Sequence, residues 1–441
     1  MQRRENQPRL IQAMMAFFTL PDLRRRLLFT FGILVVFRFM VHVPAPMVTT
    51  EVLQKLAETF EQNQLLGMLD LFSGGAMRNF SVAALGVYPY ITASIIMQLL
   101  VPVIPRLQSI AQEGEVGQRK INRITHLLTV PLTALSGYGQ LALLHSQNVI
   151  GHLEAPVTAA TVVSVTAGTV FLVWLGELIT ERGIGNGISI IIFAGIVASM
   201  PEMIGRGFLA KEDPLGLITF IILGLATLVF IVMFIEAHRR IPVQYARSTF
   251  RSGRMYRQSG STHIPLRVNT AGMIPLIFAI ALMQFPATIA TWFMNPTGQD
   301  PNFWNTIYNL FKMDASLPGG LIYWGLYFAL VIGFTFFYTM IMFEQMNLPK
   351  TLQQQGGFIP GVRPGKATAD YLNRVIKHLT FGGALFLAII AITPFIAREI
   401  TNVTILTISS TALLIAVGVA LDTMKQLEAQ LTMRRYEGFL K

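Results

Sequence analysis

The residues of this chain that could do chemistry are mainly basic side chains gathered in two segments. Seven arginines lie between residues 238 and 267, and five further Lys and Arg residues lie between residues 344 and 377. Clustered guanidinium groups bind phosphate and nucleic-acid backbones well, and anionic lipid is a competing partner. The two segments are therefore either a docking platform for a large, partly anionic partner or two solvated basic loops.

The groups that enzymes use for covalent or metal chemistry are missing or scattered. The chain has no cysteine, and its seven histidines show no metal-ligand spacing. It contains no HExxH motif, no Walker A phosphate loop and no GxSxG nucleophile elbow. We therefore expect neither an enzymatic activity nor a bound cofactor or metal.

The elements that must position the basic segments are strongly apolar. Hydrophobic residues make up 53% of the 441 residues and charged residues only 13%, about half of the ~25% usual in soluble proteins. A helix that crosses a bilayer needs about 20 mostly apolar residues. Ten stretches come near or exceed this length with no charged residue except Arg38 in the first: 27–43, 79–105, 124–153, 155–176, 183–201, 215–235, 268–299, 316–343, 378–397 and 402–421.

The distribution of Lys and Arg predicts the orientation of these spans. If the N-terminus is inside, most of the 34 basic residues lie in inner segments, so the positive-inside rule places both termini in the cytoplasm. Five spans in each half would give the halves opposite topology, as in an inverted repeat. We predict an all-α polytopic fold, divided as follows: cytosolic segment 1–26, N-terminal half 27–206, C-terminal half 207–422 with cytosolic loops at about 237–268 and 344–377, and cytosolic tail 423–441.

The spans contain almost no ionisable groups, and this bears on the class of transport. An ion-coupled transporter usually places charged side chains at mid-membrane to bind its ion or substrate. A pathway through this chain would instead be lined by apolar and neutral polar groups. A channel is therefore favoured, and a secondary transporter of a small solute is the alternative.

A short apolar run at residues 65–72 precedes the second span and is too short to cross a membrane. Ser73, Gly74 and Gly75 interrupt it before the span begins. A short helix, a glycine break and a long helix are typical of a re-entrant segment, which membranes tolerate only where protein or a cavity surrounds it. An amphipathic helix on the outer surface fits the same pattern.

Some side chains within the spans could line a pathway. Val87 and Ile91 are four residues apart, as are Ile188 and Ile192, so each pair shares a helix face. By spacing alone these are ordinary packing residues. Neutral polar residues inside spans could form hydrogen bonds between helices, or a polar seam that opens when two helices separate: Gln98, Asn186, Asn269 and Gln284.

Five motifs in order resemble the bacterial SecY family, the channel subunits of Sec protein translocases. They are LFSGG at 71–75, ALGVYPYI at 84–91, TERGIGNGISIIIFAG at 180–195, FPATIA at 285–290 and FIPGVRPG at 358–365. The similarity extends from about residue 21 to residue 436. Long motifs over nearly the whole chain are more specific than any single short pattern.

The resemblance implies a role for each ambiguous feature. A plug at about residues 65–75 would seal the outer vestibule, with Leu65, Leu66, Met68, Leu69, Leu71, Phe72, Ser73 and Gly74. Six aliphatic side chains would form the pore ring: Val87, Ile91, Ile188, Ile192, Ile277 and Ile415. Gln98 and Asn269 would belong to a lateral gate between the second and third spans and the seventh and eighth. Arg251, Arg254, Arg257 and Arg363 would dock partners.

The implied function is a protein-conducting channel in the bacterial inner membrane. It would pass unfolded secretory polypeptides across the membrane and release membrane-protein helices sideways into lipid. Because the chain has no nucleotide site, the energy would come from a SecA-like motor ATPase or a ribosome bound to the basic loops. The other expected partners are SecE-like and SecG-like small membrane subunits, signal sequences, nascent polypeptides and anionic lipid.

Overall fold

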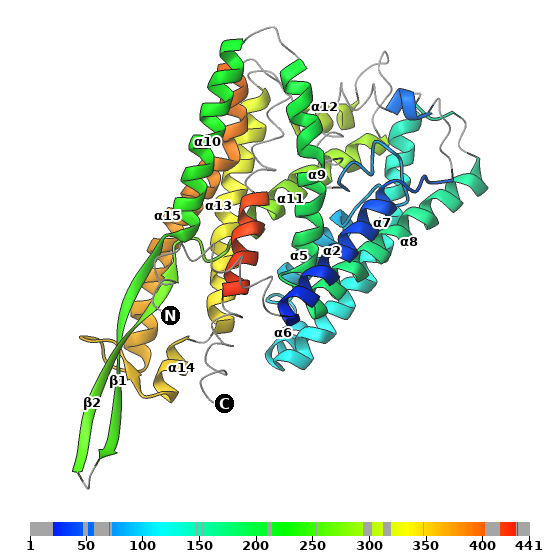
Figure 1. Cartoon of the computed structure of the whole chain (residues 1–441). Coiled ribbons are helices and arrows are strands. Elements are labelled where there is room, and N and C mark those ends of the chain that lie inside the picture. The colour runs from blue at the N-terminus through cyan, green and yellow to red at the C-terminus, as the bar shows by residue number, and fades with distance from the viewer. Residues whose placement is uncertain are drawn as a thin grey trace. The chain divides into compact units, whose positions relative to one another are not determined.

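The structure is a computed structural model that describes residues 21–46, 52–56, 70, 73–146, 149–151, 154–209, 214–251, 254–293, 302–311, 319–346, 348–401, 415–428 and 430 (Figure 1). Its helices are α2 (Pro21–Val41), α5 (Tyr88–Leu100), α6 (Pro105–Gln112), α7 (Glu115–Ser146), α8 (Ala155–Arg182), α9 (Gly187–Leu209), α10 (Pro214–Glu236), α11 (Ile274–Phe293), α12 (Phe303–Phe311), α13 (Gly319–Met346), α14 (Leu348–Gln354) and α15 (Lys366–Thr401). Its strands are β1 (His238–Arg251), β2 (Arg254–Arg267) and β3 (Gly357–Phe358).

Each of the first nine predicted spans contains a helix. They correspond in order to α2, α5, α7, α8, α9, α10, α11, α13 and α15, and residues 415–421 of the tenth stretch are also helical. Within the described residues, three helical stretches are long and apolar enough to cross a membrane, or four if α5 and α6, bent by 99°, form one span. Shorter apolar helices occupy Gly187–Pro201, Gly224–Glu236 and Ile274–Ala287.

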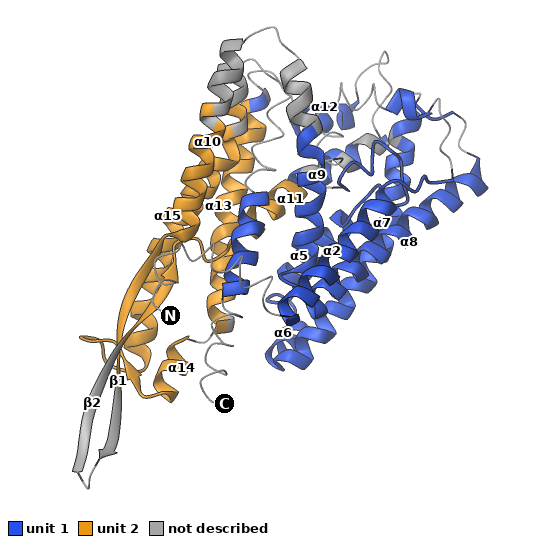
Figure 2. Cartoon of the chain, in the orientation of Figure 1, with its two compact units in different colours: residues 1–212, 283–320, 415–441 blue, residues 213–282, 321–414 orange. Residues whose placement is uncertain are grey.

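The chain forms two compact units, drawn in different colours in Figure 2. Unit 1 comprises residues 1–212, 283–320 and 415–441, and within it α7 packs against both α5 and α8, while α8 also packs against α2 and α9. Unit 2 comprises residues 213–282 and 321–414, and within it α10 packs against α15. The stacked rings of Phe234 and Phe386, with centroids 3.9 Å apart, join those two helices.

The first basic segment, expected as a loop, forms a β-hairpin within a mostly helical fold. Strands β1 and β2 pair antiparallel from His238 opposite Arg267 to Arg251 opposite Arg254. The base of β1 alternates as a half-buried strand does, with Ile241 and Val243 buried and Pro242 exposed between them. Because successive side chains of a strand point to opposite faces, the alternating apolar residues gather on one face that can be buried. This pattern favours a strand over an irregular loop.

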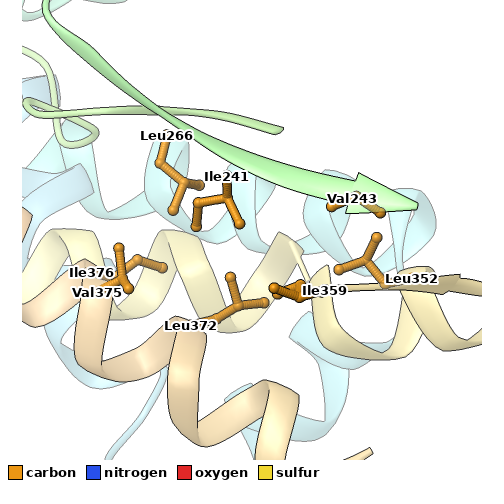
Figure 3. Close-up of a cluster of buried hydrophobic side chains, with 8 residues drawn as sticks. All are labelled: Ile241, Val243, Leu266, Leu352, Ile359, Leu372, Val375 and Ile376. Atoms are coloured by element: carbon orange, nitrogen blue, oxygen red, sulfur yellow. The ribbon is translucent and has the colours of Figure 1, made fainter. Parts of the chain in front are cut away.

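A buried apolar cluster covers that face of the hairpin (Figure 3). Its members come from β1, β2, α14, the turn after β3 and the first turns of α15: Ile241, Val243, Leu266, Leu352, Ile359, Leu372, Val375 and Ile376. Strand β3 also pairs with β1 at Gln244 and Tyr245. We call the elements that share this cluster the hairpin body. Because one core joins them, they behave as a single folded piece of unit 2.

The second predicted span begins later than expected. Residues 79–87 are turns rather than helix, and α5 begins only at Tyr88. Phe80 and Gly86 have positive φ values of 40° and 55°, which a helix cannot contain, and Pro89 suits the first turn of a helix. Residues 73–87 are buried or half-buried throughout. Irregular backbone enclosed by protein is the form that a membrane permits.

Candidate channel site

The turn that precedes α5 is closed by side-chain hydrogen bonds. The Ser73 hydroxyl donates to the Asp70 carbonyl at 2.9 Å and accepts the Met77 N–H at 3.1 Å. The Arg78 N–H donates to Asp70 Oδ1 at 3.0 Å, and the Arg78 guanidinium lies 3.5 Å from Asp70 Oδ2. Asp70 therefore holds both ends of the turn. Of the predicted plug residues only Ser73 and Gly74 are described, and Leu65, Leu66, Met68, Leu69, Leu71 and Phe72 lie outside the described residues.

Arg38 of α2 ties this turn to the first span. Its Nη1 donates to the Gly74 carbonyl at 2.8 Å. Gly74 has a φ of 71°, and a Cβ placed there would lie 2.8 Å from the Gly195 Cα of α9 and 3.2 Å from the Phe37 ring. Only glycine fits this position. No role was predicted for Arg38, although a lone charged residue within a span is itself a signal of function.

The end of the turn contacts the residues that follow α2 on one side and α8 on the other. The Ala45 N–H donates to the Phe80 carbonyl at 3.0 Å, and the Val82 N–H donates to the Val43 carbonyl at 2.9 Å. On the other side, a Cβ on Gly168 of α8 would lie 2.0 Å from the Val82 carbonyl oxygen. This close backbone approach needs glycine at position 168. Two backbone groups of the irregular segment are thus paired with residues that follow α2.

The glycine motif between α8 and α9 sets the direction of α9. Gly185 has a φ of 78°, and the Gly187 N–H donates to the Thr180 hydroxyl at 2.9 Å. The Asn186 side chain accepts the Ser189 N–H at 3.2 Å. Asn186, which the sequence offered as an interhelical or seam residue, therefore caps the helix to which it belongs.

The six predicted ring residues are all wholly or partly enclosed. Val87, Ile192 and Ile415 are buried, and Ile91, Ile188 and Ile277 are half-buried. Five of the six belong to unit 1, and Ile277 on α11 belongs to unit 2. The Ile188 side chain lies over Gly176 of α8, where an added Cβ would come within 2.6 Å of it. The convergence of the six on one waist stays a prediction.

The predicted gate residues make local hydrogen bonds. The Gln98 amide donates to the Ser94 hydroxyl one turn earlier on α5 at 3.3 Å. The Asn269 amide donates to the Gly272 carbonyl at 3.0 Å, while Asn269 Oδ1 is buried without a hydrogen-bond partner in the part of the chain that is described. An unsatisfied buried carbonyl costs about 1–3 kcal/mol, which makes Asn269 a candidate for pairing in another state.

The predicted docking arginines lie in the hairpin body and on the hairpin that extends from it. Arg363 is exposed in the turn between β3 and α15, and its carbonyl accepts the Thr368 hydroxyl at 2.9 Å. Arg251 lies opposite Arg254 where the two strands end, and Arg257 lies opposite Ser248. Among the described residues, no group of three or more His, Asp or Glu side chains could hold a metal ion.

Comparison with known sequences identifies close relatives over nearly the whole chain. The SecY family model matches residues 81–424. The protein translocase subunit SecY of Thermotoga maritima is 40% identical over 440 residues, covering 98% of each chain. That of Halalkalibacterium halodurans is 42% identical over 437 residues, covering 96% of this chain and 98% of the relative.

Solved structures share the fold at lower identity. A structure of a protein-conducting channel matches with a TM-score of 0.66 and 18% identity over 92% of each chain. A SecY structure concerned with the plug domain and the membrane seal matches with a TM-score of 0.65 and 19% identity over 92% of both chains. Sec61 in a canine ribosome–channel complex matches with a TM-score of 0.62 and 18% identity, also over 92% of both chains. None of these comparisons supports a secondary transporter. The chain is a multi-pass membrane protein that belongs to the SecY family of protein translocase subunits, and it forms a protein-conducting channel.

Proposed function

We propose that the channel passes unfolded secretory polypeptides through an aliphatic ring and releases apolar helices sideways into lipid. The ring comprises Val87, Ile91, Ile188, Ile192, Ile277 and Ile415. Aliphatic side chains can close around a passing chain without binding it. They exclude ions because an ion in a dry, apolar gap loses hydration worth far more than thermal energy.

The observation that carries this proposal is the buried, irregular segment of residues 73–87. It leads directly into α5, and its last residue, Val87, is a ring residue at the N-cap of that helix. A plug formed by residues 65–75 would be continuous with this segment, so its position would be transmitted to the ring. The Arg38 hydrogen bond to Gly74 would hold the closed position.

The lateral gate would open where Gln98 and Asn269 now make local bonds. Each amide nitrogen donates to a local partner, whereas Asn269 Oδ1 has no partner among the described residues. When the helices that carry them separate, each amide can be solvated or can bond to a passing chain. We further propose that the two five-helix halves, residues 27–206 and 207–422, are the parts that separate.

The hairpin body would dock the partner that supplies energy. The hairpin segment 238–267 carries seven arginines, and clustered arginines favour an anionic partner such as ribosomal RNA. The solved Sec61 neighbour was bound to a ribosome. A SecA-like motor ATPase would use the same surface, and SecE-like and SecG-like subunits and anionic lipid would complete the assembly. The chain would have no catalytic activity, cofactor or metal, and both termini would be cytoplasmic at the bacterial inner membrane.

Ion conductance tests the ring directly. Replacing Ile188 and Ile192 together with Ser should wet the constriction, raise ion leak and relax the requirement for an apolar signal sequence. The matched control is Val197→Ser on the same helix α9, because Val197 is 41% exposed and outside the ring. Planar-bilayer conductance and translocation of a signal-sequence mutant would measure both effects. Equal leak in the two variants, or no leak in either, would rule out the ring.

A further inference from the structure

The short helix α12 has an apolar face that described residues cover only in part: Phe303 and Leu310 are exposed, and Trp304, Ile307, Tyr308 and Phe311 are half-buried. Its sequence, FWNTIYNLF, contains no charged residue and none of its residues is buried. At 3.6 residues per turn, its apolar side chains fall within an arc of about 160° and its three polar side chains occupy the opposite side. The exposed fractions of Phe303 and Leu310 are 71% and 38%. A helix with this pattern needs an apolar surface on one side and water on the other.

Two contacts fix α12 to the end of α11, and a third caps the helix. The Asn302 side chain donates to the Phe293 carbonyl at 2.7 Å and accepts the Asn305 N–H at 3.0 Å, which caps the helix. The Trp304 ring lies 5.0 Å from the Phe293 ring, centroid to centroid. The start of α12 is therefore tied to the last residue of α11.

The position of Phe293 along α11 places α12 relative to the membrane. Helix α11 begins at Ile274, shortly after the hairpin, and has 20 residues. A helix of that length rises about 30 Å, which matches the hydrocarbon thickness of a bilayer. The predicted span 268–299 ends shortly before α12 begins at Phe303, so α12 follows one end of that span. Phe293 is itself 54% exposed, so the apolar surface continues from α11 onto α12.

We infer that α12 lies in the lipid interface at the end of this span and anchors the end of α11 there. Its apolar arc would insert between headgroups and acyl chains, while Asn305, Thr306 and Asn309 face water. Trp and Tyr prefer this depth because their rings are apolar and carry one polar group, and amphipathic helices bind in this plane. Because α12 has no charge, zwitterionic lipid suffices. The inference requires only that the chain spans a membrane and is independent of the ring, plug and gate proposals.

Single-cysteine labelling tests the inference, because the chain has no cysteine of its own. Phe303→Cys and Asn309→Cys place a thiol on the two opposite faces of α12. In the full chain, reconstituted in phosphatidylcholine vesicles with a charged maleimide on both sides, we expect Cys at 303 to react at least about tenfold more slowly, since the reactive thiolate is disfavoured in lipid. In denaturant the two rates should agree. Equal rates in vesicles would overturn the inference.

Fluorescence quenching separates lipid from protein as the covering surface. Trp304 becomes the only tryptophan when Trp174, Trp292 and Trp324 are replaced with Phe. Lipids brominated near the headgroup should quench it more strongly than lipids brominated near the chain end, and aqueous iodide should quench it weakly. Dominant iodide quenching would place α12 in water. Quenching by neither agent would mean that a small subunit or a second copy covers it, and either result contradicts a lipid anchor.

Discussion

Charge is handled in opposite ways by the buried segment of residues 73–87 and by the hairpin body. In the first, the one ionic side chain, Arg78, is paired with Asp70, and backbone groups bond within the segment and to Val43 and Ala45, which follow α2. In the second, arginines extend from a small apolar cluster and Arg363 is exposed. A surface that must let any chain pass has to avoid specific bonds, whereas a surface that must hold one partner needs them. The two regions lie in different units, so their tasks can be altered separately.

Deleting residues 65–72 should have the largest effect and should act on the first region alone. The channel should fold and leak ions, because these residues are proposed to seal and not to join helices. Conductance should rise by more than about tenfold, since removing as little as 1.4 kcal/mol from a barrier gives a factor of ten. Planar-bilayer recordings would measure it. Conductance at the wild-type level would refute the plug, and lost partner affinity would show that the two regions are coupled.

Truncating the core of the hairpin body should act on the second region alone. Leu372 is fully buried in its cluster, so Leu372→Ala should destabilise the body by about 2–5 kcal/mol. Leu385→Ala on the same helix is the control, because Leu385 is 41% exposed. Protease sensitivity of the hairpin and affinity for ribosomes would report the change. Ion conductance should stay at the wild-type level. A leak in this variant would show that the hairpin body and the segment of residues 73–87 are not independent.

Weakening the tie between α2 and the turn should produce an intermediate leak. Arg38→Gln removes a charge-assisted hydrogen bond to the Gly74 carbonyl, worth roughly 1.5–3 kcal/mol. Conductance should lie between that of the wild type and that of the plug deletion. Combined with the deletion, the substitution should add nothing, because both act on one closed state. Additive leaks would mean that Arg38 only stabilises the fold of unit 1.

The helical membrane fold and the family could be predicted from the sequence because both depend on long, repeated signals. Uncharged stretches of about 20 residues mark spans wherever they occur, and the glycine motif at residues 183–187 is a local turn whose geometry needs those residues. The structure agrees with both. These features depend on neighbours close along the chain.

What sequence could not predict depends on contacts between distant residues. Arg38 and Gly74 are 36 positions apart, and no local pattern joins them. The hairpin was missed for another reason: its arginines dominated the interpretation, although Ile241 and Val243 alternate as a strand requires. The late start of α5 could not be predicted, because residues 79–87 contain no charged residue and so look like part of a membrane span. Apolar composition indicates that a segment lies within the membrane, but it does not determine whether the backbone there is helical.

Reversing the charge of Arg363 should have the smallest effect and should act on partner docking alone. Arg363 is exposed and makes its described hydrogen bond through the carbonyl, so Arg363→Glu should leave folding and conductance unchanged. Losing a charge-assisted contact to a partner costs roughly 1.5–3 kcal/mol, and salt screens it because the group meets water. Ribosome affinity and stimulation of a SecA-like ATPase should therefore fall at low salt and converge with wild type at high salt. Arg374→Glu, an exposed residue of α15 outside the predicted docking set, is the matched control. If Arg363→Glu keeps both activities at low salt, or if the control loses them equally, docking depends on the overall charge of the body and not on this arginine.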